Sequence, residues 1–272
     1  MQGNDDRPAE ERPALDDALA LMRDLRARCE WDAAQTHQSL RPYLLEEAHE
    51  VDDAIRAGDD QLLREELGDL LLQVLFHSVV AEERGAFGLH DVVGGFIGKM
   101  KKRHPHLYGD GQRVAWEAQK ATKRDSIVDG LPVALPALHR AFRLQDRAAG
   151  VGFDWPDVEG PLAKVEEELR EVRSELASPG GSADPAGAPV YDAQHARLEL
   201  ELGDLLFAVV NLCRKAGVHP GNALDRANGK FTQRFQGIEA LAKARGIDVK
   251  TAGLAVLDGL WDEVKGGEAP AP

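Results

Sequence analysis

Two pairs of acidic residues in the C-terminal half have the spacing of metal ligands on helices. Glu168 and Glu171 are three residues apart, and so are Glu201 and Asp204. Residues at this spacing share one face of a helix, where like charges repel each other. Because Mg²⁺ and Mn²⁺ prefer hard carboxylate oxygens, a bound ion would make the electrostatic energy of such a pair favourable instead of unfavourable. A lone pair of this kind is more often a solvated acidic face, so the argument for a metal depends on the accompanying residues.

The same arrangement of acids occurs a second time, earlier in the chain. The earlier acids, with the same spacing within each pair, are Glu47, Glu50, Glu66 and Asp69. The first pair lies 121 residues and the second pair 135 residues before its later counterpart. The difference falls at residues 178–189, which are rich in Pro, Gly, Ala and Ser and are expected to form a mobile loop inserted in the second copy. The sequence therefore predicts two copies of one helical unit.

Apolar residues recur at helical spacing around these acids, and no convincing period-2 strand is present. The predicted helices span 14–28, 42–57, 60–84, 90–103, 115–124, 136–148, 161–176, 195–216, 221–245 and 254–265. Residues 30–32 are expected to form a short connection. Gly58 is expected to end one helix and Asp59 or Asp60 to cap the next. The fold class is therefore predicted to be all-α.

The repeat and the composition shifts divide the chain into five parts. These are a disordered tail at 1–13, an N-terminal domain at 14–124, a linker at 125–135, a C-terminal domain at 136–265 and a tail at 266–272. Either domain is large enough to bury a core.

The composition argues against several classes of partner. The 272 residues carry a net charge of −14. This charge argues against the binding of nucleic acid or an anionic membrane through a general basic surface. No stretch approaches eighteen apolar residues, and residues 1–13 lack the apolar core of a signal peptide. Cys29 and Cys213 are expected to be reduced thiols, so a cytoplasmic location is the simpler expectation.

Paired cations complete a chemical pattern. Lys230 and Arg234 are four residues apart on a predicted helix, and Lys99 and Arg103 stand 131 residues before them. Four acids in one place raise each other's pKa values unless a cation is present. A bound Mg²⁺ would remove this repulsion and would leave coordination positions for phosphate oxygens and water. Such a site in a helical bundle suits metal-assisted hydrolysis of a phosphoanhydride. The sequence has no P-loop and no dinucleotide-binding fingerprint.

These motifs resemble the tandem form of the MazG family of nucleoside triphosphate pyrophosphohydrolases. The resemblance covers about residues 15–265 and rests on Glu-Glu-x-x-Glu followed by Glu-x-x-Asp, together with the motifs at 103–106, 135–138, 151–155 and 201–207. It implies an all-α fold of two tandem MazG-like domains of four-helix-bundle type and a homodimer. The implied reaction is Mg²⁺-dependent cleavage of nucleoside triphosphates to a monophosphate and pyrophosphate, in the cleansing of nucleotide pools.

The resemblance also implies roles for individual residues of the second domain. The implied metal ligands are Glu168, Glu171, Glu201 and Asp204, and Glu167 is included with them among the catalytic residues. The implied nucleotide contacts are Lys164, Arg197, Lys230, Arg234 and Trp261. Arg197 stands where the family has a lysine, which keeps the charge and changes its geometry.

The first domain keeps its acids, Glu47, Glu50, Glu66 and Asp69, as a second metal site. Tyr43 stands where the second domain has Lys164, and Leu62 stands where it has Arg197. Two cations fewer should weaken the binding of a triphosphate, so the main activity is expected in the second domain.

Two alternatives remain open from the sequence. One is a narrower enzyme specific for dUTP or dCTP, although no polar set that would read a base is evident. The other is a non-catalytic helical interaction protein whose acids hold a structural metal. Trp31 and Trp155 are expected to be core or interface anchors.

Overall fold

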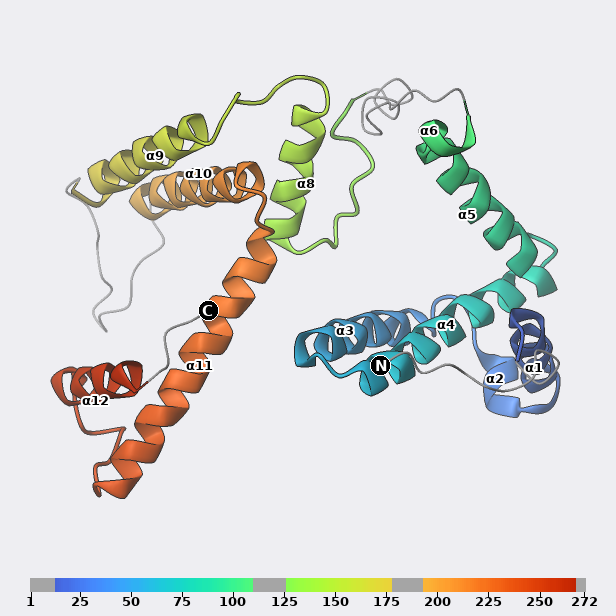
Figure 1. Cartoon of the computed structure of the whole chain (residues 1–272), viewed down its shortest axis with the longest axis horizontal. Helices are drawn as coiled ribbons and strands as arrows, with labels where there is room; N and C mark the ends of the chain where they lie inside the picture. The colour runs from blue at the N-terminus through green and yellow to red at the C-terminus, as the bar shows by residue number, and fades with distance from the viewer. Residues whose placement is uncertain (1–12, 110–125, 178–192, 268–272) are drawn as a thin grey trace. The chain divides into compact units, whose positions relative to one another are not determined.

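A computed structural model describes residues 13–109, 126–177 and 193–267 (Figure 1). These residues form eleven helices and no strand, which confirms the all-α prediction. The chain divides into two compact units, Met1–Arg113 and Val114–Pro272, and each is described by itself. The predicted helix at 115–124 and the loop at 178–189 lie outside the described residues, as do most residues of the two expected tails.

The first unit contains six described helices. They are α1 (Leu15–Arg28), α2 (Glu30–Ala34), α3 (Arg41–Ala57), α4 (Asp60–Glu83), α5 (Leu89–Arg103) and α6 (Pro105–Tyr108). Helix α4 packs against α1, α3 and α5. The ends of the predicted helices of this unit agree with those in the structure to within a residue or two. This agreement is expected, because the residues that cap a helix are its neighbours in sequence.

The turn between α3 and α4 shows this local control. Gly58 has a φ of +66°, a left-handed conformation that L side chains rarely adopt, and it ends α3. The Asp59 side chain then accepts hydrogen bonds from the backbone N–H groups of Gln61 and Leu62, at 2.9 and 3.2 Å. The two-residue connection makes α3 and α4 antiparallel neighbours.

The prediction of a short connection at 30–32 is wrong, because these residues belong to helix α2. The side chain of Arg26 donates to the carbonyl groups of Asp32, Ala33 and Gln35 and also pairs with Glu83 of α4. These bonds satisfy carbonyl groups at the end of a helix that is too short to be stable alone. A tertiary contact therefore stabilises α2, and local sequence gives little sign of it.

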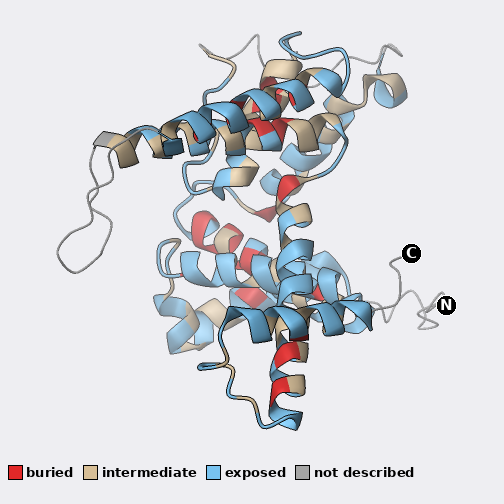
Figure 2. Ribbon diagram, turned by 90° about the vertical axis from the view of Figure 1, so that its left-hand side faces the viewer, coloured by how far each residue is buried: buried red, intermediate tan, exposed pale blue. Residues whose placement is uncertain are grey.

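The core of the first unit lies between α1 and the C-terminal half of α4. Buried residues, red in Figure 2, occupy short stretches of helices that are otherwise exposed or intermediate. Leu19 and Met22 of α1 pack with Phe76 and Val79 of α4, and all four are buried. Burial of one such side chain stabilises a fold by about 1.5–3 kcal/mol. The N-terminal half of α4, which carries Glu66, is therefore anchored by the half that follows it.

The second unit contains five described helices. They are α8 (Ala137–Ala149), α9 (Glu159–Ala177), α10 (Ala193–Lys215), α11 (Pro220–Ala244) and α12 (Leu254–Gly266). Helices α9 and α10 lie side by side, and α8 packs on α10 and α11 (Figure 1). Helix α12 packs on α11 around the buried residues Ile238, Ala242 and Leu260. None of the helices described in either unit is long and apolar enough to cross a bilayer.

Candidate active site

Helices α9 and α10 bring three of the predicted acids of the second unit together. Glu168, Glu171 and Glu201 each offer a carboxylate oxygen, and these atoms all lie within 4.8 Å of one another. Glu168 is only 5% exposed. Partial loss of hydration, together with the carboxylates of Glu168 and Glu201, raises the pKa of Glu171. The cluster therefore carries negative charge that a cation would stabilise.

Lys164 supplies part of that compensation from within the same helix. It lies one turn before Glu168, and its Nζ is 2.7 Å from carboxylate oxygens of both Glu167 and Glu168. The hydrogen bond from Lys164 lowers the pKa of Glu167, and the two carboxylates raise the pKa of Lys164. One lysine thus pairs with a buried acid of the cluster and with its exposed neighbour.

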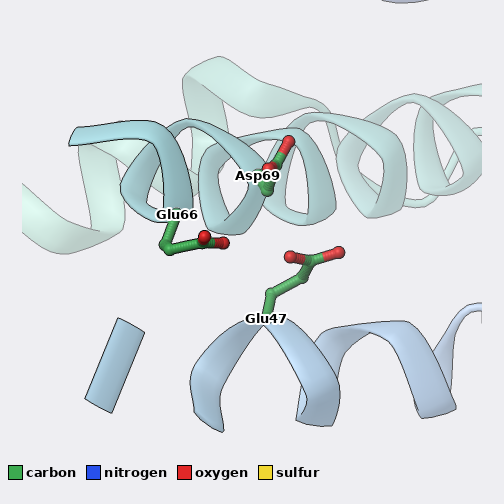
Figure 3. A group of neighbouring side chains, drawn as sticks. All are labelled: Glu47, Glu66 and Asp69. Atoms are coloured by element: carbon green, nitrogen blue, oxygen red, sulfur yellow. The ribbon is translucent and has the colours of Figure 1, made fainter. Parts of the chain in front are cut away.

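The first unit gathers a corresponding cluster between α3 and α4. Figure 3 shows Glu47 on α3 facing Glu66 and Asp69 on α4, and their ligand atoms also lie within 4.8 Å of one another. Loss of hydration, followed by Asp69 and Glu50, raises the pKa of Glu47. The pKa of Glu66 is raised by loss of hydration and then by Glu50 and Asp69. Glu50 therefore lies close enough to act on both acids, although it is not one of the three.

Each unit brings together three of its four predicted acids, and the omitted position differs. Glu50 lies outside the cluster in the first unit, and Asp204 lies outside it in the second. Asp204 instead lines a cavity together with Lys164 and Glu168. All donors in both clusters are carboxylate oxygens, which suit Mg²⁺ or Mn²⁺ rather than a soft metal.

The cavity beside the second cluster has a volume of about 610 Å³. Its walls come from α8, α9, α10 and the segments before α8 and α9. They include the aromatic side chains of Phe153, Trp155 and Phe207. Gln145, Asn211 and Arg214 add polar groups. A cavity of this size, mostly apolar and with a few polar groups, is typical of a small-molecule site.

Comparison with known proteins identifies the family. A family model described as the MazG nucleotide pyrophosphohydrolase domain matches residues 35–108. The nucleoside triphosphate pyrophosphohydrolase/pyrophosphatase MazG of Thermotoga maritima is 40% identical over 263 residues, which cover 93% of this chain and 96% of that protein. The chain belongs to the MazG family. The nucleoside triphosphate pyrophosphohydrolase of Escherichia coli (strain K12) is also 40% identical, over 266 residues that cover 92% of this chain and 97% of that protein. Similarity to these two proteins therefore extends across both units.

The other predicted nucleotide contacts of this MazG chain are more dispersed. Arg197 lies one turn before Glu201, and its Nε is 3.1 Å from a carboxylate oxygen of Glu175. Lys230 is exposed on α11, and the guanidinium carbon of Arg234 lies 5.4 Å from the ring centroid of Trp261 on α12. Lys230, Arg234 and Trp261 are not among the residues that line the cavity.

The MazG motif at 151–155 forms part of the cavity wall, which sequence reasoning missed. Asp154 pairs with Arg214 and Lys215 of α10, and these cations lower the pKa of Asp154 to about 2. Trp155 is 39% exposed and lines the cavity. It packs on Gly160, where an added Cβ would lie 2.0 Å from Trp155 Cδ1.

Neither tryptophan expected as a core anchor is buried in a core. Trp155 lines the cavity, and Trp31, its counterpart in the first unit, is 54% exposed. The prediction of a core position is therefore wrong for both residues, and the alternative that they are interface anchors stays a prediction. The motif around Trp155 was the sequence signal that could have indicated the cavity. No sequence pattern indicated Gln145 or Asn211, because these residues come from two separate helices.

Proposed function

We propose that this MazG protein is a metal-dependent nucleoside triphosphate pyrophosphohydrolase that releases a nucleoside monophosphate and pyrophosphate. The names of its relatives in T. maritima and E. coli support this reaction. The observation that carries the proposal is the convergence of Glu168, Glu171 and Glu201 beside Lys164 and a cavity of nucleotide size. Carboxylates and a lysine in this arrangement suit a metal-bound polyphosphate.

The acids of the second unit would hold Mg²⁺, or Mn²⁺ in its place. Glu168, Glu171 and Glu201 are the proposed ligands, and Asp204 is near enough to the cavity to join them. A bound ion would neutralise phosphate charge and make water a better nucleophile. The protein itself holds these acids on two packed helices, so little reorganisation is needed when the ion binds.

Lys164 and Glu167 have linked roles in this proposal. Lys164 can turn from its carboxylate partners to a phosphate oxygen, because its Nζ has three donors. Glu167 accepts a hydrogen bond from Lys164, which holds the ammonium group beside Glu168. We propose that Arg197, Lys230, Arg234 and Trp261 contact the rest of the nucleotide.

The first unit is proposed to contribute less to turnover. It gathers acids as the second unit does, but Tyr43 occupies the position of Lys164 and contacts Trp31 edge-on at 6.3 Å. A tyrosine supplies no positive charge for a triphosphate. The first cluster can therefore attract a metal ion while holding the substrate less firmly.

A homodimer is part of the proposal, and matched exposed leucines support it. Leu67 and Leu71 of α4 are exposed, and so are Leu202 and Leu206, which occupy the same positions of α10 in the second copy. Apolar surface at equivalent positions favours burial against another copy with C₂ symmetry. Light scattering at micromolar concentration should report a dimer, and a monomer would contradict this part of the proposal.

The function is tested by measuring products over a panel of ribonucleoside and deoxyribonucleoside triphosphates. We expect equimolar monophosphate and pyrophosphate with Mg²⁺ or Mn²⁺, and no turnover in excess chelator. Cleavage of dUTP or dCTP alone would favour the base-specific alternative. No release from any nucleotide, by a folded protein with Mg²⁺, would favour the interaction protein.

A further inference from the structure

We propose that Glu175 is a positioning residue, which holds the Arg197 guanidinium beside the acid cluster so that it binds the pyrophosphate half of the triphosphate. The proposal rests on the proposed function, because it concerns the substrate of the same site. It gives a role to a carboxylate that sequence reasoning did not single out.

The ion pair of Glu175 and Arg197 lies one helical turn from the acid cluster. Glu175 follows Glu171 by four residues on α9, and Arg197 precedes Glu201 by four residues on α10. Residues at this spacing share a helix face. Because α9 and α10 lie side by side (Figure 1), the ion pair is the next contact between the two helices beyond the acids. The guanidinium is therefore close to the place where the acids would hold metal and phosphate.

Glu175 occupies only part of the hydrogen-bonding capacity of Arg197. Arg197 Nε donates to Glu175 Oε2 at 3.1 Å, and the guanidinium makes no other hydrogen bond among the described residues. An arginine has four further N–H donors on its two Nη atoms, in a planar arrangement that matches phosphate oxygens. The carboxylate can therefore fix the plane of the guanidinium while the Nη groups bind phosphate.

Stability alone does not account for this ion pair. The side chains of Arg197 and Glu175 are 53% and 23% exposed, and exposed ion pairs contribute little to stability. The two helices are also joined at this level by Gln194, whose Nε2 donates to the backbone carbonyl of Glu175 at 3.2 Å. A charge that contributes little to folding, next to a site for a polyanion, points to a role in binding.

The first unit replaces both members of the ion pair. By the offsets of the repeat, Ala54 stands for Glu175 and Leu62 stands for Arg197. Ala54 is fully buried, and α3 still packs on α4. Helix packing therefore does not require the ion pair. The two charges occur together in the unit to which we assign the main turnover.

Lys164 and Arg197 supply cations at opposite ends of the acid cluster. Lys164 and Glu175 are eleven residues apart, about 16 Å along the axis of α9, so the two cations reach different parts of a bound triphosphate. Lys164 lines the cavity, which has room for the nucleoside, whereas Arg197 is not among its lining residues. The two phosphates farthest from the nucleoside are therefore placed toward Arg197, and these phosphates leave as pyrophosphate.

The test is a double-mutant cycle on the full chain, measured by steady-state kinetics in excess Mg²⁺. The substrate is the triphosphate that the wild type cleaves best. Glu175→Ala and Arg197→Leu introduce the residues of the first unit, singly and together. Without Glu175, the guanidinium can turn toward Glu201 and compete with the metal ion. We expect KM to rise about tenfold in either single variant, with kcat changed by less than about twofold.

The double variant separates positioning from a structural role. Because Glu175 acts through Arg197, the double variant should be no weaker than Arg197→Leu alone. Glu175→Gln should raise KM less than Glu175→Ala, because its amide oxygen can still accept a hydrogen bond from Arg197 Nε. Circular dichroism checks that each variant is folded.

Two inhibitors report which half of the substrate Arg197 binds. Methylenediphosphonate is a pyrophosphate analogue that cannot be hydrolysed, and its inhibition constant should rise about tenfold in both single variants. The inhibition constant of the nucleoside monophosphate should stay within about twofold of the wild-type value. A general defect of the site would weaken both inhibitors alike.

The matched control is Glu82→Ala in the first unit. Glu82 on α4 pairs with Arg23 on α1 at 2.8 Å, and both side chains are half-exposed. This is also an ion pair between two packed helices, but it is not one of the acids of either cluster. The kinetics of Glu82→Ala should equal those of the wild type.

The outcomes separate this proposal from the function on which it rests. An unchanged or lower KM in Glu175→Ala would overturn the proposal while leaving the hydrolase intact. Additive losses in the double variant would also overturn it, because Glu175 would then act independently of Arg197. Equal weakening of methylenediphosphonate and the monophosphate would overturn it as well. A wild-type chain that cleaves no nucleoside triphosphate would overturn both the proposal and the proposed function.

Discussion

Lys164 Nζ lies 2.7 Å from Glu168 Oε1, so the buried acid of the second cluster has an internal counter-ion. The lysine and a metal ion would act on the same carboxylate. The positive charge of Lys164 therefore offsets part of the negative charge of the cluster before metal or substrate binds. When a triphosphate binds, the same ammonium group can move to a phosphate oxygen.

Lys164→Met should make the fold depend more strongly on metal. Without metal, the buried Glu168 loses its partner, which should lower the midpoint of thermal unfolding. Mg²⁺ should restore most of this loss. Thermal unfolding with and without Mg²⁺ checks the prediction, with Lys243→Met on the exposed surface of α11 as the control. A variant that unfolds like wild type in chelator would show that the ion pair is not stabilising.

Gly160→Ala should displace Trp155 from the cavity wall. The added Cβ would lie 2.0 Å from Trp155 Cδ1, so the ring must move. Overpacking of this kind destabilises by about 1–3 kcal/mol. Gly259→Ala in α12 is the control, because nothing lies within 4 Å of its added Cβ, and there we expect about 0.5–1 kcal/mol of stabilisation. Urea unfolding of the two variants measures both effects. The prediction fails if the two variants shift the midpoint in the same direction.

Two histidine pairs should make the protein less stable in mild acid. His37 Nδ1 lies 2.8 Å from His77 Nδ1, and His139 Nδ1 lies 2.9 Å from His219 Nε2. Burial, and then the neighbouring histidine, lowers the pKa of both His77 and His139. The unfolded chain, with ordinary pKa values near 6.5, therefore takes up protons first as the pH falls.

The stability from these pairs should be complete above about pH 6.5 and decrease as the pH falls through the lower pKa values of the folded state. Thermal unfolding from pH 8 to pH 5 measures this decrease. His77→Gln with His139→Gln should give a shallower decrease than wild type over that range. An equally steep decrease in the double variant would assign the acid sensitivity to other groups.

The sequence predicted the helices well because their ends depend on local residues. Gly58 and Asp59 fix the turn between α3 and α4 through their own backbone and side chain. The exception, α2, depends on Arg26, which reaches it from α1. Such a contact is tertiary, and helical periodicity does not reveal it.

The candidate site likewise contains residues that the sequence could predict and residues that only tertiary packing brings together. The acids could be predicted, because Glu168 and Glu171 are close in sequence and share a helix face. Gln145 and Asn211 could not, because they line one cavity only when α8 packs on α10. The cavity between these helices is a product of packing, and the motif around Trp155 marks only one of its walls.

We predict that the acid cluster of the second unit carries the hydrolysis. The most direct test measures monophosphate and pyrophosphate release by Glu201→Gln and by its counterpart in the first unit, Glu66→Gln, with folding checked by circular dichroism. Each change removes one ligand charge and keeps the shape of the side chain. We predict a loss of about 100-fold or more for Glu201→Gln and a loss of about threefold or less for Glu66→Gln. Equal losses in the two variants, or a Glu201→Gln enzyme as active as wild type, would contradict this account.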